Sequence, residues 1–304
     1  MTTKKGGVHM YKNDNIFEFY LKNNNKKDKK ESEDLSEASR KILSCILALG
    51  YNSEYQELEF DIEKVIKMIM FDNTRFNMLS TQESIAELLN ELKENKTLES
   101  QIANKCLNFE LTIASQEIRN NLEDLYKKYL TLAYTPRLSH HVNIDKNYLF
   151  EGYENVLDHI YGTLLLALGI QSEYKYCLDY KKLFSTLLLH ETDEIVLGDD
   201  LCKLKIHHGE LPEKNKEAIS SVLEKLRKEK EYISQIIDYK RRSDITMEYA
   251  LLINQLEFIM QTKMYEVRGM YNRQGRFDKI YDATKENFYT IPCLRGILEK
   301  TKKL

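Results

Sequence analysis

The sequence of 304 residues contains no tryptophan, only three prolines and only eleven glycines. Because few residues can interrupt a helix, the segments whose apolar side chains recur every three or four positions predict an all-α fold. The sequence also lacks an apolar run of roughly 18 residues, which a membrane span requires, and its first residues contain no apolar export segment. We therefore expect a cytoplasmic protein that does not contact a membrane.

Neither sign of charge dominates the chain. The 45 basic and 48 acidic side chains are well mixed and give a formal net charge of -3. Since duplex nucleic acid is bound by a broad basic surface, the sequence argues against such a partner. The five cysteines are odd in number and widely separated. This pattern indicates reduced thiols in the core of a cytoplasmic protein, without a framework of disulfides.

The chain divides into three predicted regions. Residues 22–34 contain no apolar side chain, so they cannot offset the entropy lost on ordering, and we expect 1–34 to be mostly mobile. Residues 35–125 are predicted to be an accessory helical region, and 126–304 to be the domain that carries chemistry. The alternating charged and apolar residues of 98–134 fit the interface of a helical homodimer as well as a strut between the two halves.

Helix boundaries follow from candidate caps, glycines and prolines. Asp61 is a predicted N-cap, and Gly50, Gly169 and Gly198 are predicted to end helices. The expected helices cover 35–49, 61–71, 81–94, 98–134, 154–168, 174–195, 213–239 and 244–271.

The segment His190-Glu191-Thr-Asp-Glu194 contains candidate metal ligands. On one predicted helix, His190 and Glu194 share a face, and Glu191 can reach a metal ion placed beside His190. A neutral imidazole with carboxylates is a suitable ligand set for Mn, Fe, Co or Zn. The zinc-protease motif His-Glu-x-x-His is excluded because residue 194 is glutamate. A His–Glu pair on an amphipathic helix is more often structural, so the context must decide.

From about residue 125 to 270, the chain resembles the HD-domain metal-dependent phosphohydrolases, in particular their 5'-deoxynucleotidase-like branch. Four segments carry the resemblance in the same order as in that branch. They are Leu132-Ala-Tyr-Thr-Pro136-Arg137, Glu154-Asn-Val-Leu-Asp158-His159, His190-Glu-Thr-Asp-Glu194-Ile-Val-Leu-Gly198-Asp199, and Asn254-Gln-Leu-Glu257. The resemblance implies an HD-type helical bundle, to which the N-terminal helical region is an addition.

The resemblance also implies roles for individual residues. A divalent ion (Mn, Co, Fe, Mg or Zn) would neutralise charge on the phosphoryl oxygens of a nucleotide monoester. Arg137 would hold the phosphate, Glu194 would act as the general base, and Asp199 would lie at the rim near the sugar or the leaving group. The four metal-ligand positions would be filled by His159, His190, Glu191 and Asn254.

Two of these positions depart from the family pattern. Glu191 and Asn254 both stand where the family has aspartate, and the neutral Asn254 removes one negative charge from the ligand set. Glu257, one helical turn further, either restores that charge or supports a ligand through an ion pair. Two functions follow as hypotheses: an active hydrolase of a nucleoside 5'-monophosphate, and a weakened HD fold that binds a nucleotide or a protein without turnover.

Overall fold

The computed structural model describes residues 3–24, 35–111, 115–137, 154–174, 176–198, 211–271 and 275–304, with side chains from Tyr11 onward. Helices are the only extended regular elements within these ranges, which confirms the predicted all-α class. They are α1 (Thr3–Asn23), α2 (Glu37–Glu54), α3 (Ile62–Phe71), α4 (Gln82–Glu94), α5 (Leu98–Leu107), α6 (Gln116–Leu130), η1 (Thr131–Ala133), α8 (Val156–Glu173), α9 (Tyr180–Leu189), α10 (Glu194–Leu197), α11 (Glu213–Leu223), α12 (Glu229–Arg241), α13 (Ile245–Val267), α14 (Arg276–Thr284), η4 (Lys285–Phe288) and α15 (Pro292–Thr301).

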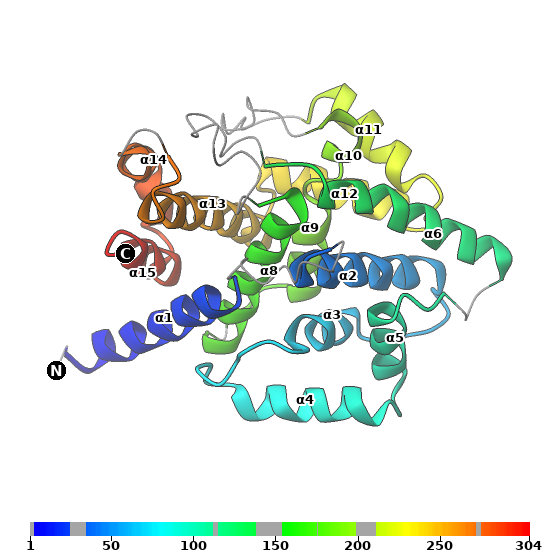
Figure 1. The fold of residues 1–304 in the computed structure, drawn as a ribbon, viewed down its shortest axis with the longest axis horizontal. Helices are drawn as coiled ribbons and strands as arrows, with labels where there is room; N and C mark the ends of the chain where they lie inside the picture. Colours follow the sequence, from blue (N-terminus) through cyan, green and yellow to red (C-terminus); the bar gives the residue numbers. More distant parts are fainter. Residues whose placement is uncertain are drawn as a thin grey trace.

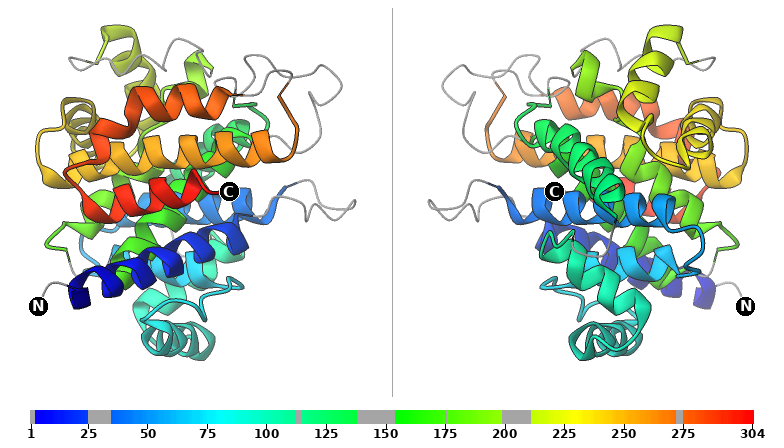
Figure 2. Two further views of the ribbon diagram at one scale, coloured as in Figure 1. Left: turned by 90° about the vertical axis from the view of Figure 1, so that its left-hand side faces the viewer. Right: turned by 90° about the vertical axis from the view of Figure 1, so that its right-hand side faces the viewer.

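Helix α8 lies at the centre of the fold, where α1, α2, α9 and α13 pack around it (Figure 1). Every residue from Val156 to Ile170 is buried. The helix is therefore enclosed on all sides, which requires small or apolar residues around its whole circumference. Helices α3 to α5 cover one end of the molecule, and α13 to α15 lie side by side on another face (Figure 2).

Most of the segment that we expected to be mobile is helical. Helix α1 extends to Asn23, and its residues Ile16, Phe19 and Tyr20 are fully buried. These three residues recur at helical spacing, so one face of α1 packs against α8 and α15. The polar composition of 22–34 gave no information about the residues before it. The remainder of that polar stretch, 25–34, lies outside the described residues.

The prediction of a single long helix over 98–134 is wrong. Two helices, α5 and α6, cover this stretch, and residues 112–114 between them lie outside the described ranges. Asn108 ends α5, Phe109 adopts a left-handed conformation with φ of 53°, and Ser115 caps the start of α6 through its side chain. Local side-chain capping therefore breaks a segment that has neither glycine nor proline.

Two glycines that were predicted to end helices lie inside them. Helix α2 continues past Gly50, and α8 continues past Gly169. A Cβ atom at position 50 would lie 2.5 Å from Leu122 Cδ2, and one at position 169 would lie 3.1 Å from Ile16 Cγ2. Both glycines therefore permit the close approach of a neighbouring helix.

The described cysteines are free thiols. Cys45, Cys106 and Cys293 are buried, as predicted for core thiols, whereas Cys177 is exposed. Cys202 lies outside the described residues. Among the described helices, none is both long and apolar enough to cross a membrane.

Candidate metal centre

Helix α8 brings His159 to the site, and its first turn is strongly fixed. Asn155 caps the helix in a reciprocal capping box with Asp158. The backbone of Thr135 to Arg137 pairs with the residues before α8: Arg137 N donates to the Glu154 carbonyl at 3.2 Å. This pairing places Arg137, which is distant in sequence, next to the first turn of α8.

Helix α9 brings His190, but it begins at Tyr180 and so covers only part of the helix predicted over 174–195. Helix α9 ends at Leu189, and His190 is its C-cap. The side chains of His190 and Thr192 bond to the carbonyls of Leu187 and Leu189, which takes acceptors from the end of the helix. His190 and Glu191 therefore lie in a turn, and Glu194 begins the short helix α10.

The turn is held from two sides. Thr192 shares a hydrogen bond with the Tyr129 hydroxyl of α6, and Asp193 accepts one from Asn215 of α11 at 2.5 Å. Contacts from two separate helices therefore fix the position of the residues that follow α9.

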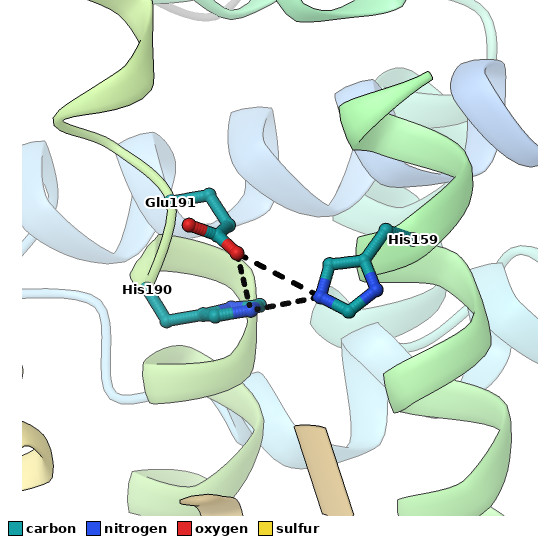
Figure 3. A group of neighbouring side chains, drawn as sticks. All are labelled: His159, His190 and Glu191. Carbon is teal, nitrogen blue, oxygen red and sulfur yellow. Dashed lines mark hydrogen bonds and ion pairs between the residues drawn. The ribbon is translucent and has the colours of Figure 1, made fainter. Parts of the chain in front are cut away.

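Three ligand atoms converge between α8 and α9 (Figure 3). His159 Nε2 lies 3.4 Å from His190 Nε2. Glu191 Oε1 lies 3.7 Å from the first of these nitrogens and 3.4 Å from the second. All three residues are buried, with at most 4% of their surface exposed. This arrangement of two imidazole nitrogens and one carboxylate oxygen suits a divalent transition metal.

The outer nitrogens of both imidazoles determine their tautomers. His190 Nδ1 lies 2.8 Å from the Leu187 carbonyl, and His159 Nδ1 lies 2.6 Å from Glu257 Oε2. Since a carbonyl and a carboxylate accept hydrogen bonds, each Nδ1 donates, and each Nε2 directs a lone pair into the site.

The donor set therefore fits a cation. Two facing lone pairs and a carboxylate oxygen repel one another unless a positive charge lies among them. Burial, together with the neighbouring His159 and against the effect of Glu191, lowers the pKa of His190 to about 3. A buried imidazole that stays neutral is the form that binds a metal ion.

Arg137 lies beside the same group. Its Nη2 is 2.9 Å from Glu191 Oε1, and its Nη1 is 3.1 Å from Glu194 Oε1. Arg137 and Glu194 are both buried. The structure thus brings together five residues that the sequence selected, which are His159, His190, Glu191, Glu194 and Arg137.

The other selected residues have different outcomes. Asn254 Nδ2 donates to the Tyr239 hydroxyl at 2.7 Å, and the Tyr239 ring packs edge-on against His190 with centroids 5.8 Å apart. Asn254 is therefore linked to His190 through Tyr239, and its role as a metal ligand stays a prediction. Asp199 lies outside the described residues. The carboxylate of Glu257 binds the outer nitrogen of His159, which favours the supporting alternative. Glu257 also forms a second buried group of possible metal ligands with Glu154 and His159.

The part of the chain that contains these residues is similar to a known protein family. Residues 146–292 match the model of the HD domain family. The C-terminal half of the chain contains an HD domain. This is a family of metal-dependent phosphohydrolases, and the buried residues His159, His190 and Glu191 fall within the matched range. No curated protein matches the chain.

Two residues near the metal centre were not found from the sequence. Gly162 lies one turn after His159, and a Cβ there would lie 2.5 Å from Glu257 Oε1. A glycine inside a helix costs about 1 kcal/mol relative to alanine, so a glycine near a candidate ligand indicates that a neighbouring group packs closely there. The sequence could therefore have pointed to Gly162. Tyr20, which contacts Glu257 from α1, gave no local signal at all.

Proposed function

We propose that this HD domain is a metal-dependent phosphohydrolase of a (deoxy)nucleoside 5'-monophosphate. One observation carries the proposal: Glu191 Oε1 is shared between Arg137 Nη2 and the two imidazole nitrogens. A cation site and an anion-binding guanidinium thus meet at a single carboxylate oxygen. A phosphate that binds the metal ion would lie within reach of the arginine. The resemblance of the four segments to the 5'-deoxynucleotidase-like branch supports the choice of substrate.

The chain's own residues supply complementary functions in this reaction. The planar fork of Arg137 binds two oxygens of the phosphate and neutralises part of its charge. Glu194 takes a proton from the attacking water, whose oxygen bonds to phosphorus. The bond from phosphorus to the nucleoside oxygen then breaks, and the same proton passes to that oxygen, so the nucleoside leaves as an alcohol. His159, His190 and Glu191 hold the divalent ion, which when bound supplies Lewis acidity at the phosphoryl oxygens.

Substrate binding requires Arg137 to exchange partners. In the structure the guanidinium contacts the carboxylates of Glu191 and Glu194. An incoming phosphate would compete for the same fork, and this exchange would release Glu194 to accept a proton. Because Arg137 and Glu194 are buried, an ion pair between the guanidinium and either the carboxylate or the phosphate is stronger than it would be in water.

Binding without turnover is the second candidate function. The neutral Asn254 favours it, because an amide at a ligand position contributes no charge, and its Nδ2 is engaged by Tyr239. In this case the domain would bind a nucleotide or a protein partner through the same fold.

Metal analysis together with phosphate release separates the two functions. The purified protein would be assayed with nucleoside 5'-monophosphates in the presence of Mn²⁺, Co²⁺ or Mg²⁺, beside the isosteric variant Glu194→Gln. We expect the wild type to bind metal and release phosphate, and the variant to bind metal but lose about 10²- to 10⁴-fold in rate. Metal binding and nucleotide binding without phosphate release would favour the second function. Absence of bound metal under all conditions would overturn the metal-dependent mechanism.

A further inference from the structure

Glu257 uses its two carboxylate oxygens for two different partners. Oε2 accepts from His159 Nδ1 at 2.6 Å, and Oε1 accepts from the Tyr20 hydroxyl at 3.0 Å. All three side chains are completely buried. They come from α8, α13 and α1, and both α1 and α13 pack against α8 at the centre of the molecule (Figure 1).

The direction of these hydrogen bonds is fixed. Burial and the nearby carboxylates of Glu257 and Glu154 raise the pKa of Tyr20 well above its usual value. The hydroxyl therefore keeps its proton and donates it to Glu257. Asn24 Nδ2 donates to the Tyr20 oxygen at 2.5 Å, which leaves the hydroxyl proton free to point at the carboxylate.

The space around Glu257 is also restricted. Gly162 offers no side chain, and an added Cβ would lie 2.5 Å from Glu257 Oε1 and 2.9 Å from its Cγ. Glu257 therefore lies directly against the backbone of α8, one turn from His159. A carboxylate confined in this way can keep its position only if both oxygens have donors.

We propose that Tyr20 is a positioning residue for the metal centre: its hydroxyl orients Glu257, and Glu257 in turn fixes the tautomer and the ring of His159. This inference rests on the proposed function, since it gives the Nε2 of His159 the role of a metal ligand. Carboxylate partners of metal-binding histidines orient the ring and raise its basicity. Helix α1 lies outside the matched range 146–292. A segment outside the HD domain therefore completes the support of one of its ligands.

A purely structural role for Tyr20 makes a different prediction, and Tyr174 provides the matched control. The Tyr174 hydroxyl also anchors α1 to the core, by donating to Asn13 Oδ1 at 2.8 Å. Tyr174 follows the last turn of α8, whereas His159 lies in the first turn. The two residues are about 22 Å apart along the helix axis. Tyr174→Phe thus removes an anchor of α1 without affecting the neighbourhood of Glu257.

The test is a titration of metal-free protein with Mn²⁺, followed by calorimetry, for the wild type, Tyr20→Phe and Tyr174→Phe. We expect Tyr20→Phe to weaken Mn²⁺ binding about tenfold, at the lower end of the effects of outer partners on metal sites. Tyr174→Phe should bind Mn²⁺ as the wild type does. Equal affinity in all three proteins, or an equal loss in both variants, would overturn the proposal. If Tyr20→Phe does not fold, Asn24→Ala removes the donor to the hydroxyl and should give a smaller loss in the same direction.

A second readout needs no metal and separates this proposal from the proposed function. Long-range ¹H–¹⁵N correlation spectra of histidine-labelled protein report which ring nitrogen carries the proton, and His159→Gln identifies the signals. In the wild type we expect His159 to be protonated at Nδ1, and in Tyr20→Phe a population protonated at Nε2 should appear. Spectra unchanged by Tyr20→Phe would refute the proposal. A wild type that binds no Mn²⁺ but shows this tautomer shift would refute the metal-dependent function and leave the orienting role of Tyr20 intact.

Discussion

The two histidines of the candidate metal centre are held in different ways. His190 is fixed locally, because its Nδ1 donates to the carbonyl of Leu187, three residues earlier in the chain. His159 is fixed at long range, because its Nδ1 donates to Glu257, which is 98 residues away, and Glu257 also binds Tyr20 of α1. One ligand therefore depends on its own helix, and the other depends on the packing of three helices.

The difference shows that two ligands of one site can differ in how strongly mutations elsewhere affect their orientation. A backbone carbonyl cannot be removed by substitution, so the orientation of His190 is robust to mutation. A chain of side chains can be altered at each member, so His159 can be tuned by residues that never touch a ligand or substrate. Changes at Tyr20 or Glu257 should therefore reach the candidate metal centre through His159.

The largest expected effect is the removal of either histidine. His159→Leu and His190→Leu should each weaken Mn²⁺ binding by more than about 100-fold, since the loss of an outer partner alone costs about 10- to 100-fold. The metal-free variants should differ in stability, because His159→Leu leaves the buried carboxylate of Glu257 without one donor. We expect the free energy of unfolding of His159→Leu to be about 1–3 kcal/mol lower than that of His190→Leu.

Urea unfolding of the metal-free variants checks this difference. Equal unfolding free energies would mean that Glu257 finds another donor, and the contrast between the two histidines would then fail.

The second effect concerns the stability of the metal-free protein in acid. The pKa of His190 is lowered to about 3 in the folded state, so between about pH 6.5 and 3 the unfolded chain binds a proton that the folded protein excludes. The contribution of this group to stability is complete above pH 6.5 and decreases as the pH falls. Its slope is at most about 1.4 kcal/mol per pH unit.

Unfolding free energies of the metal-free protein at pH 7, 6 and 5 would measure this slope. His190→Leu should have a shallower pH dependence than the wild type. Identical profiles for both proteins would contradict the assignment of the acid sensitivity to His190.

The residues of the candidate metal centre were easier to predict from the sequence than the helix boundaries around them. The spacing of His159, His190 and Glu191 within a family pattern was sufficient to select them, and the structure brings their ligand atoms together. The break after Leu189 was not predicted, because residues 190–194 contain neither glycine nor proline. Side chains that bond to their own backbone end the helix there, and helical periodicity does not register such bonds.

Contacts between helices limited the prediction in a second way. Gly50 and Gly169 have the local character of helix ends, but each accommodates a side chain from another helix. Tyr20 is separated from Glu257 by 237 residues, and no local rule connects the two. Helix α1 was therefore expected to be mobile although it supports the centre.

The smallest expected effect is that of a single methyl group at Gly162. Gly162→Ala should improve helix propensity by about 1 kcal/mol, but the added Cβ would lie 2.5 Å from Glu257 Oε1 and displace a carboxylate that both Tyr20 and His159 bind. Such overpacking costs about 1–3 kcal/mol, so we expect a net loss of stability of at most about 2 kcal/mol and a severalfold weaker affinity for Mn²⁺.

Gly50→Ala is the matched control for this substitution. Its added Cβ would also lie 2.5 Å from a neighbouring atom, but that atom is Cδ2 of Leu122, in the contact between α2 and α6. Gly50→Ala should therefore change the unfolding free energy and leave Mn²⁺ affinity at the wild-type value. If both alanines weakened Mn²⁺ binding equally, the affinity would follow general packing, and the dependence of His159 on Glu257 would lose its support.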